Sequence, residues 1–266
     1  MAMILPHWQV HEGQGPHLLL VHGFLSSRAQ WMLNIEALGK VCTPVTVELF
    51  GHANSPSPAD PACYEPGYYV ACFEAIRTAL GVERWFLLGY SLGAGLTLRY
   101  AFEHPQRVTG HLFTNSTSGL ADAAQRQAWR AGSKEAAAGI RSGGHSAMVR
   151  IPVHPRHARS LPEAVQGALL ADAKLHNPLG IAMTLEVTNP AVSMRERLAE
   201  NTRPACLIWG TKERRFTPHA EHARSAMADL RIVELDAGHG MNMEAPAAFN
   251  LAVAEFIDQC RTSSTH

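Results

Sequence analysis

The sequence predicts an α/β protein: a doubly wound, mostly parallel sheet with a helical lid inserted after its sixth strand. Three features of the chain lead to this prediction. Short apolar runs alternate with helical stretches along most of its length. These runs are continuously apolar, as in strands that helices cover on both faces. One long central segment contains no strand-like run.

The predicted strands are short runs rich in Leu, Val, Ile and Phe. They are 17–21 (HLLLV), 44–49 (PVTVEL), 84–88 (RWFLL), 110–115 (GHLFTN), 205–210 (ACLIWG) and 231–235 (RIVEL). The predicted helices are 30–39, 67–80, 92–104, 218–228 and 246–260. Pro246 suits the first turn of the last helix, where its missing N–H has no intrahelical partner to lose.

The segment without strands divides the chain into three parts: core residues 1–116, an insertion at 117–202, and core residues 203–266. Ala-rich helical stretches open and close the insertion, and a region with Gly and Pro breakers separates them. The insertion follows the strand at 110–115, which we count as the sixth of a complete sheet. We expect it to cover the carboxyl edge of the sheet, where open α/β folds bind ligands.

The composition limits the kinds of molecule that the protein is expected to bind. Lys plus Arg and Asp plus Glu both count 23, so the chain lacks the basic excess that is typical of nucleic-acid binders. No apolar run is as long as a membrane span, and the first residues do not resemble a signal peptide. The five cysteines show no CxxC pairing, which suits a reducing cytoplasm. We therefore expect a cytoplasmic protein that acts on a small molecule, without nucleic acid or membrane. The sequence does not predict its oligomeric state.

The stretch LLGYSLGAG (87–95) places Ser91 between Gly89 and Gly93, at the junction of a predicted strand and a predicted helix. A serine on such a sharp turn adopts a strained backbone and needs small neighbours. The turn also exposes the hydroxyl at the top of the sheet. This context favours a nucleophile over an ordinary loop serine.

A serine hydroxyl needs a base, and the base needs an orienting carboxylate. His239 lies in DAGHGMNMEAP, between the last strand and the last helix. Glu213 is the acid in the loop that follows the strand at 205–210, although a plain surface glutamate is the alternative reading. No carboxylate follows the strand at 110–115, which favours Glu213. The predicted catalytic residues are therefore Ser91, Glu213 and His239.

An oxyanion needs two N–H donors near the nucleophile. The Leu92 N–H begins the helix after Ser91, and the Phe24 N–H belongs to the loop VHGFLSS after the first predicted strand. We predict that these two groups form the oxyanion hole. Neither a cofactor nor a metal is expected for this chemistry.

The motifs VHGF, GYSLGAG, WGTKERRF and GHGMNMEAP, in this order, resemble those of the α/β-hydrolase superfamily from about residue 15 to 258. The segment ELFGHANSPSP is similar to the loop D-x-P-G-H-G-x-S of that superfamily, with Glu48, Phe50 and Ala53 as departures. We interpret this loop as structural, and His52 as a hydrogen-bonding residue within it.

Within the superfamily the chain resembles the carbon–carbon and ester hydrolase branch, and most of all the SHCHC synthases of the menaquinone pathway. Those enzymes eliminate pyruvate from a succinyl-bearing carboxylated ring. The stretches GYSLGAG, GLADAAQRQAWR and LEVTNPAVSMRERL carry this resemblance. In that family an arginine four residues after the nucleophile binds a substrate carboxylate, and here the position is Gly95. The family acid is usually Asp, and here it is Glu213.

Residues 120–160 contain seven basic residues against two acids, so the insertion is a candidate for attracting anions. Arg126 and Arg130 lie one turn apart on one helix face and are the candidate substrate contacts, with Tyr90 beside the nucleophile. Solvated helix faces without a substrate role are the alternative reading of this charge.

These observations predict a serine hydrolase that cleaves an ester or thioester of a small organic acid. The prediction includes acids that carry a further carboxylate group. Two alternatives stay open. The first is carbon–carbon bond hydrolysis or a synthase-like elimination at the same three residues. The second is a non-catalytic, ligand-binding protein of the same fold.

Overall fold

The structure, a computed structural model, describes residues 3–263. In this part of the chain a seven-stranded sheet has the order β1-β3-β2-β4-β5-β6-β7. Its strands are β1 (Trp8–Val10), β2 (His17–Val21), β3 (Thr43–Val47), β4 (Trp85–Gly89), β5 (Val108–Thr114), β6 (Ala205–Gly210) and β7 (Leu230–Leu235). Only β1 pairs antiparallel; the other neighbours are parallel. All carboxyl ends of the parallel strands therefore meet at one edge.

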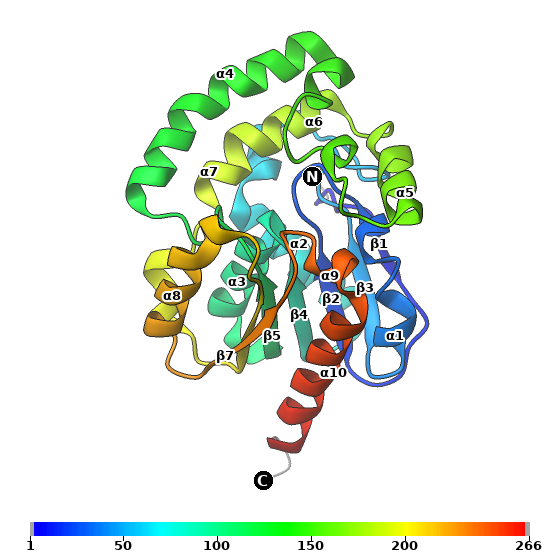
Figure 1. The fold of residues 1–266 in the computed structure, drawn as a ribbon, viewed down its shortest axis with the longest axis vertical. Helices are drawn as coiled ribbons and strands as arrows, with labels where there is room; N and C mark the ends of the chain where they lie inside the picture. Colours follow the sequence, from blue (N-terminus) through cyan, green and yellow to red (C-terminus); the bar gives the residue numbers. More distant parts are fainter. Residues whose placement is uncertain (1–2, 264–266) are drawn as a thin grey trace.

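Helices cover both faces of the sheet, as Figure 1 shows. On one face α1 (Ile35–Gly39) and α10 (Pro246–Ser263) pack on side chains such as Leu18 and Leu20. On the other, α2 (Pro66–Ala79) and α3 (Leu92–Glu103) pack with Leu19 and Val21, and α8 (Thr217–Ala226) packs with Leu207 of β6. Successive residues of β2 thus enter opposite cores, which explains why the strand has no polar face.

The chain between β5 and β6 forms the insertion, and in the described residues it contains helices and no strand. They are α4 (Ala123–Met148, with a break at Gly144), α5 (Glu163–Ala173), α6 (Pro178–Met183) and α7 (Asn189–Ala191), with shorter turns between them. Figure 1 shows α4, α6 and α7 above the sheet, at the edge where the parallel strands end. In chain order β5 is the fifth strand, so the insertion follows the fifth strand and not the sixth that we counted.

Most predicted elements agree with the structure to within two residues, and the differences have local causes. The predicted helix at 30–39 is two pieces, the 3₁₀ helix η1 (Arg28–Trp31) and α1, separated by Met32–Asn34. The edge strand β1 was not predicted, because three residues are too few to show a pattern. The helix α9 (Met241–Glu244) was also missed for its shortness. The five cysteines are free and buried, and none of the described helices is long and apolar enough to cross a membrane.

Buried histidines connect the loops at the carboxyl edge to the insertion. His22 accepts a hydrogen bond from the Leu49 N–H (3.0 Å), and His52 accepts one from the Leu25 N–H (3.2 Å). His176, from the insertion, accepts one from the Ala53 N–H at 2.9 Å. An imidazole can accept in this way only while that ring nitrogen is unprotonated. Burial lowers the pKa of His22 to about 3 and that of His176 to about 4.

These histidines predict a loss of stability in acid. The unfolded chain binds protons on them near pH 6.5, whereas the folded chain binds them only at much lower pH. The free energy of unfolding should therefore fall as pH drops from 6.5 towards 4, by up to about 1.4 kcal/mol per pH unit for each group. Urea unfolding at a series of pH values between 7.5 and 4 measures this change in the free energy of unfolding. His176→Gln should flatten the slope, while His222→Gln on α8 serves as control. A stability that is constant from pH 7 to 5 would contradict the prediction.

Candidate active site

Ser91 occupies a strained turn between β4 and α3. Its backbone has φ 51° and ψ −116°, a left-handed conformation that is uncommon for a residue with a side chain. The Ser91 N–H donates to Thr114 Oγ1 (3.2 Å), and Ser116 Oγ donates to the Ser91 carbonyl at 2.5 Å. The hydroxyl groups at the end of β5 and just after it therefore bond both the N–H and the carbonyl of Ser91 and hold the turn in place.

The turn needs a glycine at position 93 because β2 passes directly beneath it. A Cβ at Gly93 would lie 2.4 Å from the Val21 carbonyl oxygen and 2.6 Å from that of His22. No side chain fits at these distances. The small residue that the sequence motif indicated is therefore required by close packing of the helix start on the adjacent strand.

His239 and Glu213 form a hydrogen-bonded pair. His239 Nδ1 lies 2.8 Å from Glu213 Oε2, and the two side chains are 37% and 20% exposed. Asn115 Nδ2 donates to the same carboxylate oxygen (2.8 Å), and the Asn115 amide also bonds both backbone groups of Gly210. Burial opposes ionisation of Glu213. The hydrogen bond and charge of His239, then Asn115 and Arg215, outweigh it and hold the pKa of the carboxyl below its ordinary value.

Tyr90 links the serine turn to the histidine loop. Its hydroxyl donates to the His239 carbonyl oxygen (2.8 Å), and its ring lies edge-on to the imidazole with centroids 5.2 Å apart. Tyr90 is adjacent to Ser91 in the chain, so this contact ties the loop of His239 to the turn that carries the serine, and both residues line one cavity. Burial raises the pKa of the Tyr90 phenol, which keeps it a neutral donor. The residue borders the cavity, but its hydroxyl is engaged by the protein.

The Phe24 and Leu92 N–H groups have no hydrogen-bond partner within residues 3–263. Leu92 begins α3, so its N–H has no intrahelical acceptor. Phe24 precedes Leu25, a second non-glycine residue with left-handed backbone, at φ 55°. Both residues line the cavity that Ser91 also lines. The two donors proposed from the sequence are thus available for a ligand.

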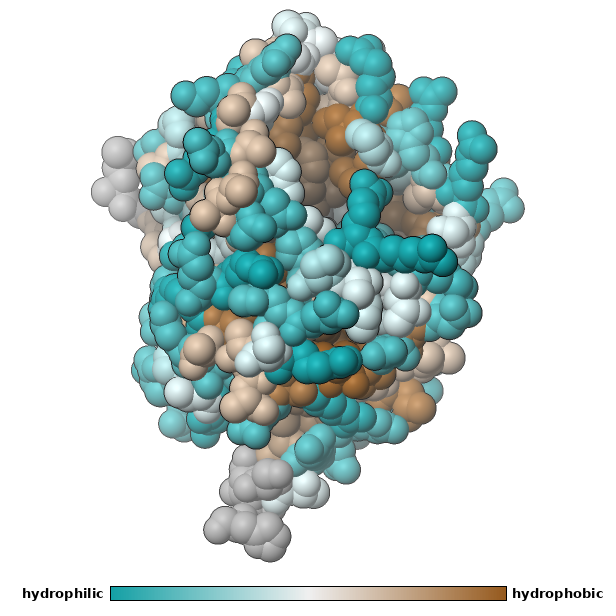
Figure 2. All heavy atoms as spheres, turned by 60° about the vertical axis from the view of Figure 1, so that its left-hand side comes forward, coloured by the Kyte–Doolittle hydropathy of each residue, from teal (hydrophilic) through white to brown (hydrophobic). Residues whose placement is uncertain are grey.

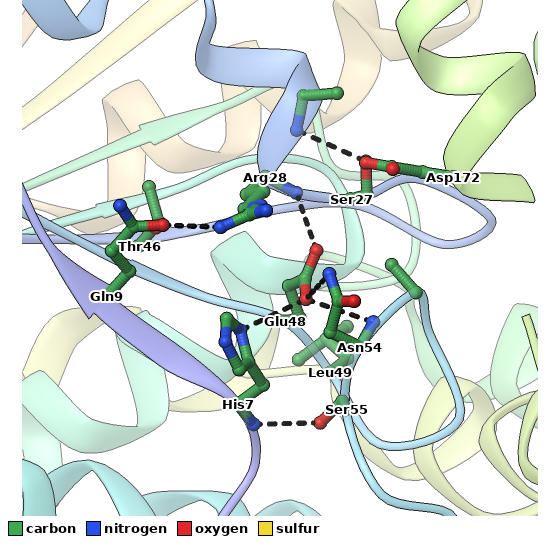
Figure 3. Close-up of polar contacts among 12 residues, drawn as sticks. His7, Gln9, Ser27, Arg28, Thr46, Glu48, Leu49, Asn54, Ser55 and Asp172 are labelled. Carbon is green, nitrogen blue, oxygen red and sulfur yellow. Dashed lines mark hydrogen bonds and ion pairs between the residues drawn. The ribbon is translucent and has the colours of Figure 1, made fainter. Parts of the chain in front are cut away.

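A polar network around Glu48 holds Ser27 and Arg28, which follow the loop that carries Phe24 (Figure 3). The buried Glu48 carboxylate accepts the Arg28 N–H (3.4 Å) and the Asn54 N–H (3.1 Å), and lies 3.1 Å from His7 Nδ1. Ser27 Oγ donates to Asp172 Oδ2 of α5 at 2.6 Å. Glu48 therefore has a structural role, as predicted for its loop, and Asp172 ties the insertion to the core.

A cavity of about 730 Å³ lies between the sheet edge and the insertion. Its lining includes Ser91, Glu213 and His239. Apolar lining side chains include Leu25, Trp129, Val153, Leu161, Leu169 and Met243. In Figure 2 a recess with hydrophobic surface, bordered by hydrophilic residues, opens in the upper half of the molecule, where the insertion lies. The site can hold a mostly apolar small molecule with a few polar contacts.

The predicted substrate contacts Arg126 and Arg130 do not line the cavity. Arg126 forms an ion pair with Glu196 on the insertion, and Arg130 is exposed. The neighbouring Trp129 faces the cavity instead, because α4 turns its aromatic side chain inward and the arginines outward. The cationic side chain that does line the cavity is Arg215, two residues after Glu213, and it has no ion-pair partner among the described residues.

Gly95 is a second position where packing forbids a side chain. A Cβ there would lie 2.7 Å from the Val192 carbonyl oxygen and 3.0 Å from Gly119 Cα. The insertion therefore packs directly on α3 at position 95, four residues after Ser91. An arginine does not fit at this position in this chain.

Sequence reasoning missed Asn115, Arg215 and Trp129. The sequence shows no acid directly after β5, but it gives no sign that the amide of Asn115 hydrogen-bonds Glu213. Arg215 stood within the quoted motif WGTKERRF, two residues from the acid, and that position is the signal that could have found it. Nothing in the sequence separates Trp129 from the other residues of its helix.

Comparison with known proteins gives a consistent picture. The family described as "alpha/beta hydrolase fold" matches residues 16–139. A 2-succinyl-6-hydroxy-2,4-cyclohexadiene-1-carboxylate (SHCHC) synthase of Serratia proteamaculans is 27% identical over 94% of this chain and 96% of its own. A putative synthase of the same name from Bacillus subtilis is 25% identical over 92% of each chain. The solved structure of MenH from S. aureus superposes with a TM-score of 0.84 at 19% identity, covering 96% of this chain and 99% of that one.

Proposed function

The chain belongs to the α/β-hydrolase superfamily, and from this premise we propose that it is a serine hydrolase that cleaves an ester or thioester of a small, carboxylated organic acid. The observation that carries the proposal is the His239–Glu213 pair, at 2.8 Å, in the same cavity as the strained Ser91. A histidine held in this way has its other ring nitrogen free to act as a base.

In the proposed reaction Ser91 Oγ attacks the substrate carbonyl carbon while His239 Nε2 takes the hydroxyl proton. Glu213 accepts the hydrogen bond from Nδ1 and stabilises the imidazolium. The Phe24 and Leu92 N–H groups bind the oxyanion. The carbon–oxygen or carbon–sulfur bond then breaks, and the leaving group takes the proton from His239. Water attacks the acyl-enzyme in the same manner and releases the acid.

The test of this proposal is covalent labelling with a fluorophosphonate, read by intact mass. Wild type should gain one adduct, and Ser91→Ala none. Glu213→Ala and His239→Ala should label slowly, because the serine is then poorly activated. Absence of an adduct on wild type would contradict an activated serine. Ligand binding without catalysis would then be the better interpretation.

The position of Arg215 supports the proposal that the substrate carries a carboxylate. Its guanidinium borders the cavity without an ion-pair partner in the described chain, and arginine matches carboxylate geometry well. Because packing leaves no room for an arginine at position 95, Arg215 is our candidate for binding a substrate anion.

Replacement of Arg215 by glutamine should therefore change charge selectivity. We expect kcat/KM for 4-nitrophenyl hemisuccinate to fall about 10- to 100-fold, and that for neutral 4-nitrophenyl pentanoate to change much less. Rising salt should weaken only the hemisuccinate reaction of wild type. Arg214→Gln, on an exposed residue outside the cavity lining, is the matched control. Equal losses for both esters would contradict a carboxylate contact.

A second candidate is an SHCHC synthase-like elimination, in which His239 abstracts a carbon-bound proton without an acyl-enzyme. The synthase relatives, which match more than nine-tenths of this chain, favour it. The packing at Gly95 weighs against the same substrate contacts. An elimination that survives Ser91→Ala and is lost in His239→Ala would favour this candidate over the hydrolase.

A further inference from the structure

Gln30 is a buried amide at the border of the candidate active site. It lies in η1, directly after the loop that carries Phe24, and its side chain is 0% exposed. It is nevertheless one of the residues that line the cavity with Ser91 and His239. Neither the general fold nor the proposed triad chemistry gives it a role.

The orientation of the amide is fixed by its neighbours. Gln30 Oε1 accepts a hydrogen bond from Ser26 Oγ (2.9 Å) and a longer one from the Gly23 N–H (3.5 Å). A backbone N–H can only donate, so the atom that faces Gly23 is the oxygen. The main chain of Gln30 is also engaged, since its N–H donates to the Ser27 carbonyl and its carbonyl accepts from Asn242 Nδ2.

Gln30 Nε2 is left without a partner. It is buried, it carries two N–H donors, and no acceptor within the described residues bonds to it. Other buried side-chain atoms also lack partners, but within residues 3–263 Gln30 is the one residue of this group that lines the cavity. A buried amide without a partner costs stability, and such groups are usually satisfied by a protein group, water or ligand.

We propose that Gln30 Nε2 donates a hydrogen bond to a second oxygen of the substrate, other than the carbonyl oxygen under attack. The residue would thereby select substrates that carry a keto, ether or carboxyl oxygen at that position. A substrate without this oxygen leaves the buried donor unpaired, which is how a hydrogen-bonding site discriminates against an analogue. The inference rests on the proposed function, because it assumes that the cavity around Ser91 binds the substrate.

The test compares matched esters that differ by one oxygen. The acyl-side pair is 4-nitrophenyl 4-oxopentanoate against 4-nitrophenyl pentanoate. The leaving-group pair is 2-methoxyethyl butanoate against butyl butanoate. Gln30→Glu keeps an oxygen for Ser26 and Gly23 and replaces the free donor with a second carboxyl oxygen, at the cost of a buried carboxyl group. Gln30→Met removes the whole amide and serves if the first variant does not fold. Gln127→Glu, the same change on an exposed residue of α4 outside the cavity lining, is the control.

The readout is the ratio of kcat/KM within each pair, so a general loss of activity from a disturbed loop cancels. We expect wild type and Gln127→Glu to prefer the oxygen-bearing member of one pair, and Gln30→Glu to reduce this preference about 10-fold. The pair that responds tells on which side of the scissile bond the oxygen lies. Ratios that Gln30→Glu and Gln30→Met leave unchanged in both pairs would overturn the proposal and leave Gln30 a structural residue.

Failure of the proposed function gives a different result. In that case wild type is not labelled by the fluorophosphonate and hydrolyses none of the esters. Calorimetric titration of wild type and Gln30→Glu with the acyl-side acids (4-oxopentanoate and pentanoate) and with the two leaving-group esters then measures the same contact by binding. Tighter binding of the oxygen-bearing member of one pair that disappears in Gln30→Glu would support the donor. Equal binding within both pairs by both proteins would refute it.

Discussion

Replacement of Ser91 by alanine is expected to lower kcat/KM for ester hydrolysis by about 10⁴- to 10⁶-fold. The hydroxyl is the only group that forms the covalent bond in the proposed mechanism, so no neighbour can substitute for it. The measurement is steady-state hydrolysis of 4-nitrophenyl esters by purified wild type and variant. Ser225→Ala, on the exposed side of α8, should retain wild-type activity. A Ser91→Ala protein with activity within tenfold of wild type would contradict a serine nucleophile.

Replacement of Glu213 by glutamine is expected to lower kcat by about 10³- to 10⁴-fold. The change keeps the size of the side chain but removes the negative charge that stabilises the imidazolium. His239 Nδ1 and Asn115 Nδ2 both meet the same oxygen, Glu213 Oε2, and the amide oxygen of glutamine can take its place. The expected loss therefore comes from the missing charge.

The matched control for this variant is Glu221→Gln, an exposed residue of α8. Circular dichroism and thermal unfolding should show that Glu213→Gln remains folded, so that the loss belongs to the chemical step. A kcat within threefold of wild type would mean that Glu213 is a surface glutamate, the alternative that the sequence left open.

The fold was predictable because its strands are buried on both faces. A run such as HLLLV or ACLIWG cannot face water on either side, and the structure has strands at those residues, His17–Val21 and Ala205–Gly210. The edge strand Trp8–Val10 is only partly buried, so its composition carries no comparable signal. The candidate triad was predictable for a related reason. The loops that follow parallel strands lie at the same edge of the sheet, however far apart these loops are in the sequence.

The substrate contacts could not be predicted in the same way. Which face of α4 turns inward depends on its packing over the sheet, and this placed Trp129 at the cavity and Arg130 in solvent. The inference about Gln30 depends on which neighbours leave its amide nitrogen unpaired, which is a property of three segments together. Such features depend on tertiary packing, which cannot be predicted from a single sequence.

The most direct test of the central claim is to trap the acyl-enzyme. Wild type is mixed with excess 4-nitrophenyl pentanoate, quenched in acid within milliseconds to seconds, and read by intact mass and peptide mapping. An acyl-enzyme mechanism predicts a pentanoyl adduct on the peptide containing Ser91, formed with a burst of nitrophenol and absent from Ser91→Ala. Turnover that proceeds with no acyl adduct at any time, and that persists in Ser91→Ala, would contradict it.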